Sequence, residues 1–261
     1  MTGPRTVPRD GLLPDARRTV ERYERAHGIR FRHLLRFDPP ALASLHGPGE
    51  LPGSVRVASA GRPEVVERMA VVTEVANLPE QRQAHRRRYL RALLDVYGLL
   101  PVRVADAAAE PGAVVLAPER EGRILAERLG VLPHPRGWTP QAKRMPAAGG
   151  LLVGLDDRLP ARSDRLVIVD GVVASGVTLM AAVHLAARPG AVVDVFTCHA
   201  TAAGARALTR YARQREVSLT LHVGHVSGVL DESFHSVDPG DRGTLLLGDI
   251  GDTISPVARE A

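Results

Sequence analysis

Several common ingredients are scarce in this 261-residue chain, and each scarcity excludes a class of protein. Cys198 is the single cysteine, which excludes an internal disulfide framework and any cysteine-rich zinc site. Aromatic residues make up 3% of the chain, so we expect a core built mainly of alanine, valine and leucine. No apolar run approaches the roughly 18 residues that a transmembrane helix needs. We therefore expect a soluble, cytoplasmic protein that has no membrane partner.

Lysine is also scarce, because Lys143 is the only lysine among 34 basic residues. The formal net charge is +5, but so strong a preference for arginine reflects genome composition more than selection for nucleic-acid binding. Nucleic acid is therefore not an expected partner.

The segment from Met1 to Asp15 contains three prolines and no apolar core, so it does not have the pattern of a secretory signal.

Frequent catalytic and binding motifs are missing as well. The chain has no Walker-type loop, no dinucleotide Gly-x-Gly-x-x-Gly after a strand, and no His-Glu-x-x-His. A hydrolase nucleophile elbow needs glycine two places before the serine, where Ser175 has Val173. The ten histidines show no ligand spacing, so we predict no metal site made by the protein alone.

The chain divides into two predicted regions. Residues 1–75 are interpreted as an N-terminal extension, partly disordered and then helical or irregular, since prolines interrupt the stretch from 31 to 61. Helices are expected over 17–27, from Pro63 toward Val72, and from Pro79 to Gly98. Residues 76–261 are predicted to form the main α/β domain.

After Gly112 short apolar runs alternate with helical segments. Strands are predicted at 113–117, 151–155, 166–169, 192–197 and 219–223, and helices at 123–129, 178–187 and 203–215. Residues 133–150 are predicted to form a basic loop. This alternation favours an α/β fold with a mostly parallel sheet flanked by helices, in which ligands bind at the carboxyl ends of the strands.

The most informative segment is the run from Leu166 to Val183. A buried strand places Asp170 before a turn of small residues, and the turn leads directly into an apolar helix starting near Thr178. Backbone amides at such a turn are uncommitted, and the helix dipole adds partial positive charge there. The pattern therefore predicts a phosphate-binding turn.

This segment resembles the phosphoribosyl-pyrophosphate (PRPP) signature of type I phosphoribosyltransferases, a hydrophobic strand with one or two acids before a small-residue loop. The resemblance implies a phosphoribosyltransferase-type sheet with an extra N-terminal region. It implies that Asp170 meets the ribose hydroxyls and that the loop holds the 5′-phosphate. The implied phosphate-binding residues are Ala174, Ser175, Gly176, Val177 and Thr178.

Two further segments resemble the uracil phosphoribosyltransferase branch. Residues 247–252, Leu-Gly-Asp-Ile-Gly-Asp, are similar to its base-binding element and imply base contacts from Leu247, Gly248 and Asp249. Residues 120–122 resemble its Arg-Ala-Gly turn, so Arg120 is expected to contact pyrophosphate. The basic loop from Arg136, with Lys143 and Arg144, occupies the place of its PRPP-covering loop.

The resemblance implies an enzyme that transfers the phosphoribosyl group from PRPP to a base, with catalytic residues Asp170, Arg120 and Asp249. It also implies Mg²⁺ bound through PRPP and a homodimer. Thr253, Leu245 and Leu246 depart from the branch near the base element, which leaves the acceptor base open. Three hypotheses follow: transfer to a uracil-like base, transfer to a modified heterocycle in specialised biosynthesis, and a non-catalytic PRPP- or nucleotide-sensing regulator.

Overall fold

The computed structural model of the chain describes residues 4–78, 82–119, 121–147, 150–232, 234–241 and 244–247, and at 82–84, 147, 245 and 247 it describes the backbone. Its centre is a parallel sheet in the order β3-β11-β10-β8-β4-β5, with β9 paired beside β10. The strands are β3 (Val55–Val57), β4 (Val114–Leu116), β5 (Gly137–Trp138), β8 (Ser163–Val169), β9 (Val172–Val173), β10 (Ala187–Ala200) and β11 (Ser218–Val226).

Strand β8 shows why the central strands are apolar almost throughout. Leu166 and Ile168 point into one core cluster, whereas Val167 and Val169 point into a second cluster on the other face. Successive side chains of a strand alternate between faces, so a strand covered on both sides needs apolar residues at every position. The parallel arrangement follows from the strand–helix alternation of the sequence.

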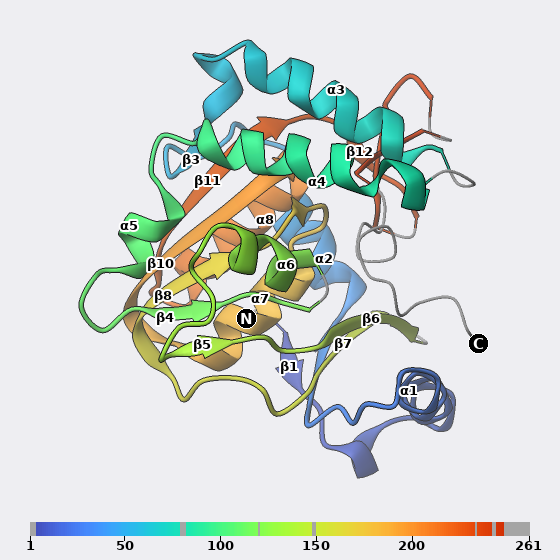
Figure 1. Cartoon of the computed structure of the whole chain (residues 1–261). Coiled ribbons are helices and arrows are strands. Elements are labelled where there is room, and N and C mark those ends of the chain that lie inside the picture. The colour runs from blue at the N-terminus through green and yellow to red at the C-terminus, as the bar shows by residue number, and fades with distance from the viewer. Residues whose placement is uncertain are drawn as a thin grey trace.

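Helices cover both faces of the sheet (Figure 1). Helices α2 (Pro39–His46), α7 (Val177–Ala186) and α8 (Ala202–Gln214) pack on one face. Helices α3 (Glu64–Ala76), α4 (Arg82–Gly98), α5 (Val104–Ala108) and α6 (Glu121–Arg128) pack on the other. The predicted α/β fold with a mostly parallel sheet flanked by helices is confirmed.

A second, antiparallel sheet lies beside the first, in the order β1-β2-β7-β6. Its strands are β1 (Arg5–Thr6), β2 (His33–Phe37), β6 (Ala142–Ala147) and β7 (Gly150–Leu155). In β7, Val153 faces the central core, whereas Leu152 joins a small cluster under helix α1 (Pro14–His27). This sheet is therefore sandwiched between α1 and the main core.

Two predictions about this region are wrong. The segment 133–150 is not a continuous loop, since it forms β5 and β6, and residues 151–155 join the antiparallel sheet rather than the parallel one. The physical reason is long-range pairing, because β7 finds its partner in β2, more than a hundred residues earlier. Strand β3 of the first 75 residues likewise pairs with β11, and the domain boundary at residue 75 stays a prediction.

A third sheet of short strands completes the described structure, namely β12 (Val229–Leu230), β13 (Ser236–Val237) and β14 (Leu245–Leu247). It lies near the carboxyl ends of the central strands, where His199 Nε2 is 2.9 Å from Ser236 Oγ. Short 3-10 helices cover 9–11 and 58–60. Within the described ranges, no helix combines the length and apolar character needed to cross a membrane.

Candidate functional site

Asp170 directly follows strand β8, at the carboxyl edge of the central sheet. Its backbone carbonyl accepts the Tyr97 hydroxyl at 2.7 Å, and its Oδ1 accepts the Gly171 amide at 2.9 Å. Tyr97 is fully buried, and burial, with added repulsion from Cys198, Asp170 and Glu121, raises the pKa of this phenol well above its usual value. Tyr97 therefore remains a neutral donor that fixes the backbone at the strand end.

The turn after Asp170 directs its carbonyls into the protein. The Val173 carbonyl accepts the Thr201 amide at 3.1 Å, and the Ala174 carbonyl accepts the Thr201 hydroxyl at 2.6 Å. The Ser175 carbonyl lies 2.8 Å from His46 Nε2. Three successive carbonyls are thus held from α2 and from the start of α8.

The amides of this turn consequently point the other way. In a trans peptide the N–H of one residue is antiparallel to the carbonyl of the residue before it. Inward carbonyls at 173–175 therefore direct the amides of Ala174, Ser175 and Gly176 outward, and among the described residues these amides donate to no protein acceptor. Helix α7 begins at Val177, so its partial positive charge adds to the same place. This arrangement fits a phosphate dianion.

Two glycines allow the turn and helix α8 to approach each other. Gly176 has φ +74°, a left-handed conformation that glycine adopts without strain, and it forms the N-cap of α7. A Cβ at Gly204 would lie 2.0 Å from the Ala174 carbonyl oxygen, so this position admits no side chain. Thr201 caps α8 by accepting the Gly204 amide at 2.9 Å. The sequence thereby brings the starts of α7 and α8 to the same turn.

The other predicted phosphate-binding residues lie in the same turn with different exposure. Ser175 and Val177 are buried, whereas Ala174 and Thr178 are half-buried. Val177 belongs to the core cluster, so its backbone alone is available to a ligand. The contacts of these residues with PRPP stay predictions.

His46 reaches the turn from the N-terminal part of the chain. Burial, partly offset by its hydrogen bond to Ser175, lowers the pKa of His46, which favours the neutral ring. Arg206 and Arg210 hold the residues after His46, since both guanidinium groups donate to the Gly47 carbonyl. No motif around His46 indicated this contact, because the two residues are 129 positions apart in the sequence.

Lys143 and Arg144 lie on β6 and point to opposite faces of the antiparallel sheet. Lys143 Nζ is 5.7 Å from the ring centroid of Tyr23 on α1. Arg144 Nη1 donates to the Phe234 carbonyl at 2.9 Å, and the Phe234 ring packs 6.1 Å from that of His46. Of these two residues of the predicted covering loop, Arg144 is thus the one on the side of the turn.

The predicted residues Arg120, Gly248 and Asp249, together with Thr253, lie outside the described residues. Leu247 is the last residue of β14, which pairs with β13, and the Leu246 carbonyl accepts the Thr73 hydroxyl at 3.0 Å. The start of the proposed base element is thereby attached to α3.

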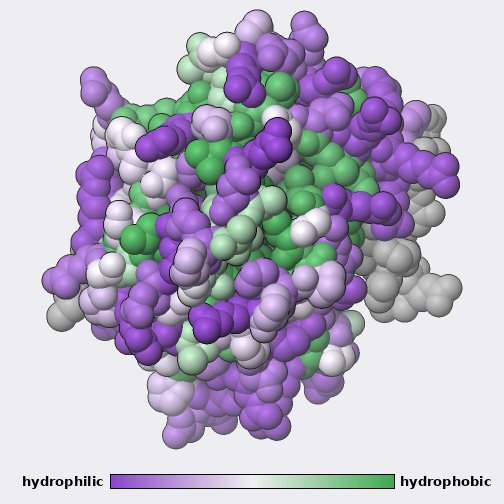
Figure 2. All heavy atoms as spheres, turned by 60° about the vertical axis from the view of Figure 1, so that its left-hand side comes forward, coloured by the Kyte–Doolittle hydropathy of each residue, from purple (hydrophilic) through white to green (hydrophobic). Residues whose placement is uncertain are grey.

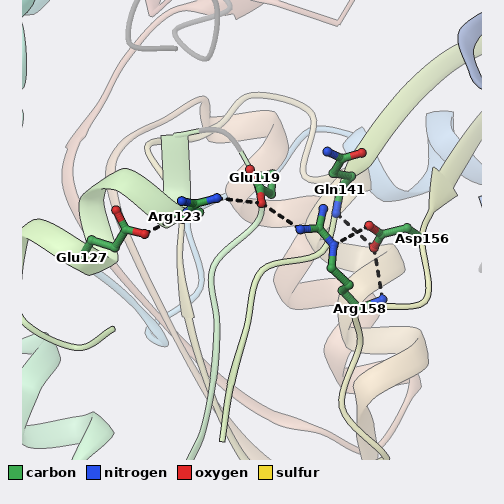
Figure 3. Close-up of polar contacts among 6 residues, drawn as sticks. All are labelled: Glu119, Arg123, Glu127, Gln141, Asp156 and Arg158. Carbon is green, nitrogen blue, oxygen red and sulfur yellow. Dashed lines mark hydrogen bonds and ion pairs between the residues drawn. The ribbon is translucent and has the colours of Figure 1, made fainter. Parts of the chain in front are cut away.

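A partly buried ion-pair network is centred on Glu119, in the loop after β4 (Figure 3). The Glu119 carboxylate, 14% exposed, accepts Arg123 at 3.3 Å and Arg158 at 2.9 Å. Asp156 accepts the Gln141 amide at 3.1 Å and pairs with Arg158 at 2.7 Å. The network joins the loop after β4 to the open end of the β6–β7 hairpin, where Gln141 precedes β6 and Asp156 follows β7. Its members were not predicted, since they come from three separate segments.

A shallow hollow of about 580 Å³ lies at the opposite, amino edge of the sheet, lined by Arg136, Trp138, Arg162 and Arg165 among others. Arg165 is already paired with Glu110 and Asp194, each at 2.8 Å. Figure 2 brings forward the left-hand side of Figure 1 and shows a mainly hydrophilic surface interspersed with apolar side chains. At this edge, the Arg165 guanidinium group is therefore paired with carboxylates of the protein itself.

No family model and no curated protein matches the chain. Among solved structures, it is similar to the AQ2163 protein from Aquifex aeolicus, with a TM-score of 0.52 and 18% identity over 78% of this chain and 100% of that chain. This likeness shows the fold.

Phosphoribosyltransferases are also among the similar structures. The adenine phosphoribosyltransferase from Trypanosoma brucei, in complex with AMP, pyrophosphate and ribose-5-phosphate, aligns with a TM-score of 0.40 and 16% identity over 73% of this chain and 94% of that chain. The APRTase from Giardia lamblia, complexed with 9-deazaadenine, aligns with a TM-score of 0.33 and 17% identity over 59% and 84%. These two alignments are too loose to support an argument about substrates.

Proposed function

We propose that the chain is a phosphoribosyltransferase, which transfers the 5-phosphoribosyl group of PRPP to a ring nitrogen of a heterocyclic base and releases pyrophosphate. The observation that carries this proposal is the turn after Asp170, whose amides at 174–176 point outward beside a carboxylate. A phosphorylated sugar presents a dianion and hydroxyl donors, and these groups match the amides and the carboxylate.

In the proposed reaction, the bond between sugar C1 and the pyrophosphate oxygen breaks and a bond from C1 to the base nitrogen forms. The bond electrons leave with pyrophosphate, and the base nitrogen loses its proton. The turn holds the 5′-phosphate and Asp170 holds the ribose, so the sugar is aligned with the base. Arg120 is proposed to stabilise the leaving pyrophosphate, and Asp249 to organise the base or a metal-bound water.

Magnesium is the proposed cofactor, bound through PRPP. Within the described part of the chain, no three His, Cys, Asp or Glu side chains are grouped to hold a metal ion. The carboxylate of Asp170 fits the preference of Mg²⁺ for oxygen ligands, few of which come from the protein when phosphates are present. When bound, the ion would neutralise charge on the pyrophosphate.

The acceptor is proposed to be a uracil-like base, on the strength of the similarity of residues 247–252 to the uracil branch. Leu247 and its two successors are the proposed base contacts. The departures at Leu245, Leu246 and Thr253 favour the alternative of a modified, non-uracil heterocycle. Cytoplasmic location and a homodimer belong to the same proposal.

The test is to incubate the full chain with PRPP, Mg²⁺ and a panel of pyrimidines, purines and unusual heterocycles. Pyrophosphate is measured enzymatically and products are read by mass. We expect pyrophosphate release with at least one base and a product heavier than that base by a phosphoribosyl group. PRPP binding without release across the panel would favour the regulator hypothesis, and absence of binding would contradict the proposal.

A further inference from the structure

A second carboxylate, that of Glu121, lies against the backbone of Gly171. A Cβ built on Gly171 would be 1.8 Å from Glu121 Oε1 and 2.1 Å from its Cδ. The carboxylate therefore occupies the space that a side chain at position 171 would take. Gly171 carries no positive φ, so a side chain at 171 is excluded by this carboxylate rather than by the backbone conformation.

The start of helix α6 is seated directly on the end of strand β8. A Cβ at Gly122 would lie 2.4 Å from the Val169 carbonyl oxygen, so the absence of a side chain permits this contact. Glu121 is the first residue of α6, where the helix dipole favours a negative charge. The two contacts at Gly122 and Gly171 hold the Glu121 carboxylate over the strand end that carries Asp170.

The two acids share one environment. Glu121 is 7% exposed, and its charge and that of Asp170 both raise the pKa of the buried Cys198 thiol, after burial itself. Both also act on the pKa of Tyr97, again after burial. Titratable groups whose pKa values are shifted by burial and by neighbouring charges are concentrated at functional sites.

We propose that Glu121 is a specificity-determining residue of the sugar site, which accepts a hydrogen bond from one ribose hydroxyl while Asp170 accepts one from the other. This inference rests on the proposed function. The amides of the phosphate turn follow Gly171 after the short strand β9, so a sugar whose phosphate lies on that turn would place its ring near these acids. Two carboxylates can each accept a hydrogen bond from one of two neighbouring hydroxyls, so they bind a sugar that carries both hydroxyls more strongly than a single carboxylate does.

The experiment compares two ligands by calorimetry in Mg²⁺-free buffer with chelator, so that the protein groups alone are measured. Ribose 5-phosphate reports on the phosphate turn and the hydroxyl contacts, and inorganic phosphate reports on the turn alone. We expect Glu121→Gln to raise the Kd of ribose 5-phosphate about tenfold, because a charge-assisted hydrogen bond is lost. The Kd of inorganic phosphate should stay within about twofold.

A matched pair of double variants moves the carboxylate from 121 to 171. Glu121→Ala with Gly171→Asp should restore ribose 5-phosphate affinity to within a few-fold of the wild type. Glu121→Ala with Gly171→Ala has similar packing without the charge and should remain weak. Circular dichroism and thermal unfolding of each variant establish that the comparison is between folded proteins.

The outcomes separate this inference from the proposed function. The inference is supported if ribose 5-phosphate affinity recovers in Glu121→Ala with Gly171→Asp and does not recover in Glu121→Ala with Gly171→Ala. The inference is overturned if Glu121→Gln leaves the Kd of ribose 5-phosphate unchanged, or if it raises the Kd of ribose 5-phosphate and of inorganic phosphate equally. It is also overturned if the two double variants bind ribose 5-phosphate with the same affinity. In those cases the proposed function still stands if the wild-type protein binds PRPP. A wild-type protein that binds neither PRPP nor ribose 5-phosphate would contradict both the inference about Glu121 and the proposed function.

Discussion

The two edges of the central sheet use their polar groups in opposite ways. At the amino edge, Arg165 pairs with Glu110 and Asp194, and Arg188 pairs with Asp164 at 3.1 Å. At the carboxyl edge, the protein holds the carbonyls of residues 173–175 inward and directs the amides of residues 174–176 outward. The amino edge satisfies its charges internally, whereas the carboxyl edge presents a ready set of donors.

This difference separates an edge whose charges are paired within the protein from the edge that we propose binds the ligand. Arginine side chains that already pair with neighbouring carboxylates are less available to a ligand. Outward-pointing amides at the start of a helix can donate hydrogen bonds to an anion, and the helix dipole favours the negative charge there. The predictions below change one edge at a time and compare the result with a change at the other.

The largest effect is expected at Asp170. Asp170→Asn keeps an oxygen that accepts the Gly171 amide but removes the charge that is proposed to bind the ribose hydroxyls. The loss of charge-assisted hydrogen bonds should lower kcat/KM for PRPP about 100-fold, with the fold intact. The matched control is Asp164→Asn at the other end of β8, where the carboxylate is exposed and paired with Arg188. Unchanged kinetics in Asp170→Asn would remove this residue from the site.

A smaller loss is expected when the inward hold on the turn is released. Thr201→Val keeps the side-chain shape but removes the hydroxyl that caps α8 and binds the Ala174 carbonyl. We expect a fall in unfolding free energy of about 1 kcal/mol and a rise of roughly tenfold in the Kd of inorganic phosphate. Thr201→Ser keeps the hydroxyl and should behave like the wild type. Equal phosphate binding by both variants would contradict the role given to Thr201.

The carboxyl edge should also make stability depend on pH. Burial, with a smaller contribution from His225, lowers the pKa of His199 to about 3. Its unfolded value is near 6.5, so below that pH the unfolded chain binds a proton that the folded chain does not. The free energy of unfolding should therefore fall by about 2 kcal/mol between pH 6.5 and 5 on account of this residue.

The same sign applies to His46, His184 and His225, whose pKa values are lowered chiefly by burial. Denaturant unfolding at several pH values checks the prediction, with His199→Gln as the comparison. The glutamine has no titration in this range, so its stability should decline less steeply toward acid. Parallel pH curves for the two proteins would be inconsistent with a buried neutral His199.

The smallest effect is expected at the amino edge. Arg162 lines the hollow there, on the side of the sheet opposite the phosphate turn. Arg162→Ala should change the Kd of PRPP and of inorganic phosphate by less than about twofold, since surface charges at this distance are largely screened. Calorimetry at 0.15 M salt checks this, and a loss comparable with that of Thr201→Val would erase the distinction between the edges.

The central sheet could be predicted from the sequence because its signals are local. Apolar runs such as 166–169, followed by turns and helices, specify parallel strands covered on both faces. The antiparallel sheet could not be predicted in the same way. Strand β2 lies in a segment interrupted by prolines, and its pairing with β7 spans more than a hundred residues. No strand was predicted at 33–37, and no local pattern identified β7 as the partner of this segment.

The same division holds for the site. Asp170 and the turn that follows it could be predicted, because strand, acid, small residues and helix are contiguous. Thr201 gave a usable signal as a threonine immediately before an alanine-rich helix, typical of an N-cap. His46 and Glu121 reach the turn through the tertiary fold. For the contact between Glu121 and Gly171, the only clue in the sequence was the glycine that follows Asp170, together with a glutamate in the Arg-Glu-Gly turn at 120–122.

The central claim is that the amides after Asp170 bind a phosphoryl group, and ¹⁵N–¹H spectra of the deuterated full chain test it most directly. On titration with ribose 5-phosphate, the amide resonances of Ala174, Ser175 and Gly176 should shift in a saturable way. The Gly190 amide, which donates to the Glu216 carbonyl at 2.7 Å, should stay in place as an internal reference. Saturating ligand with no movement of the three turn amides would contradict the account.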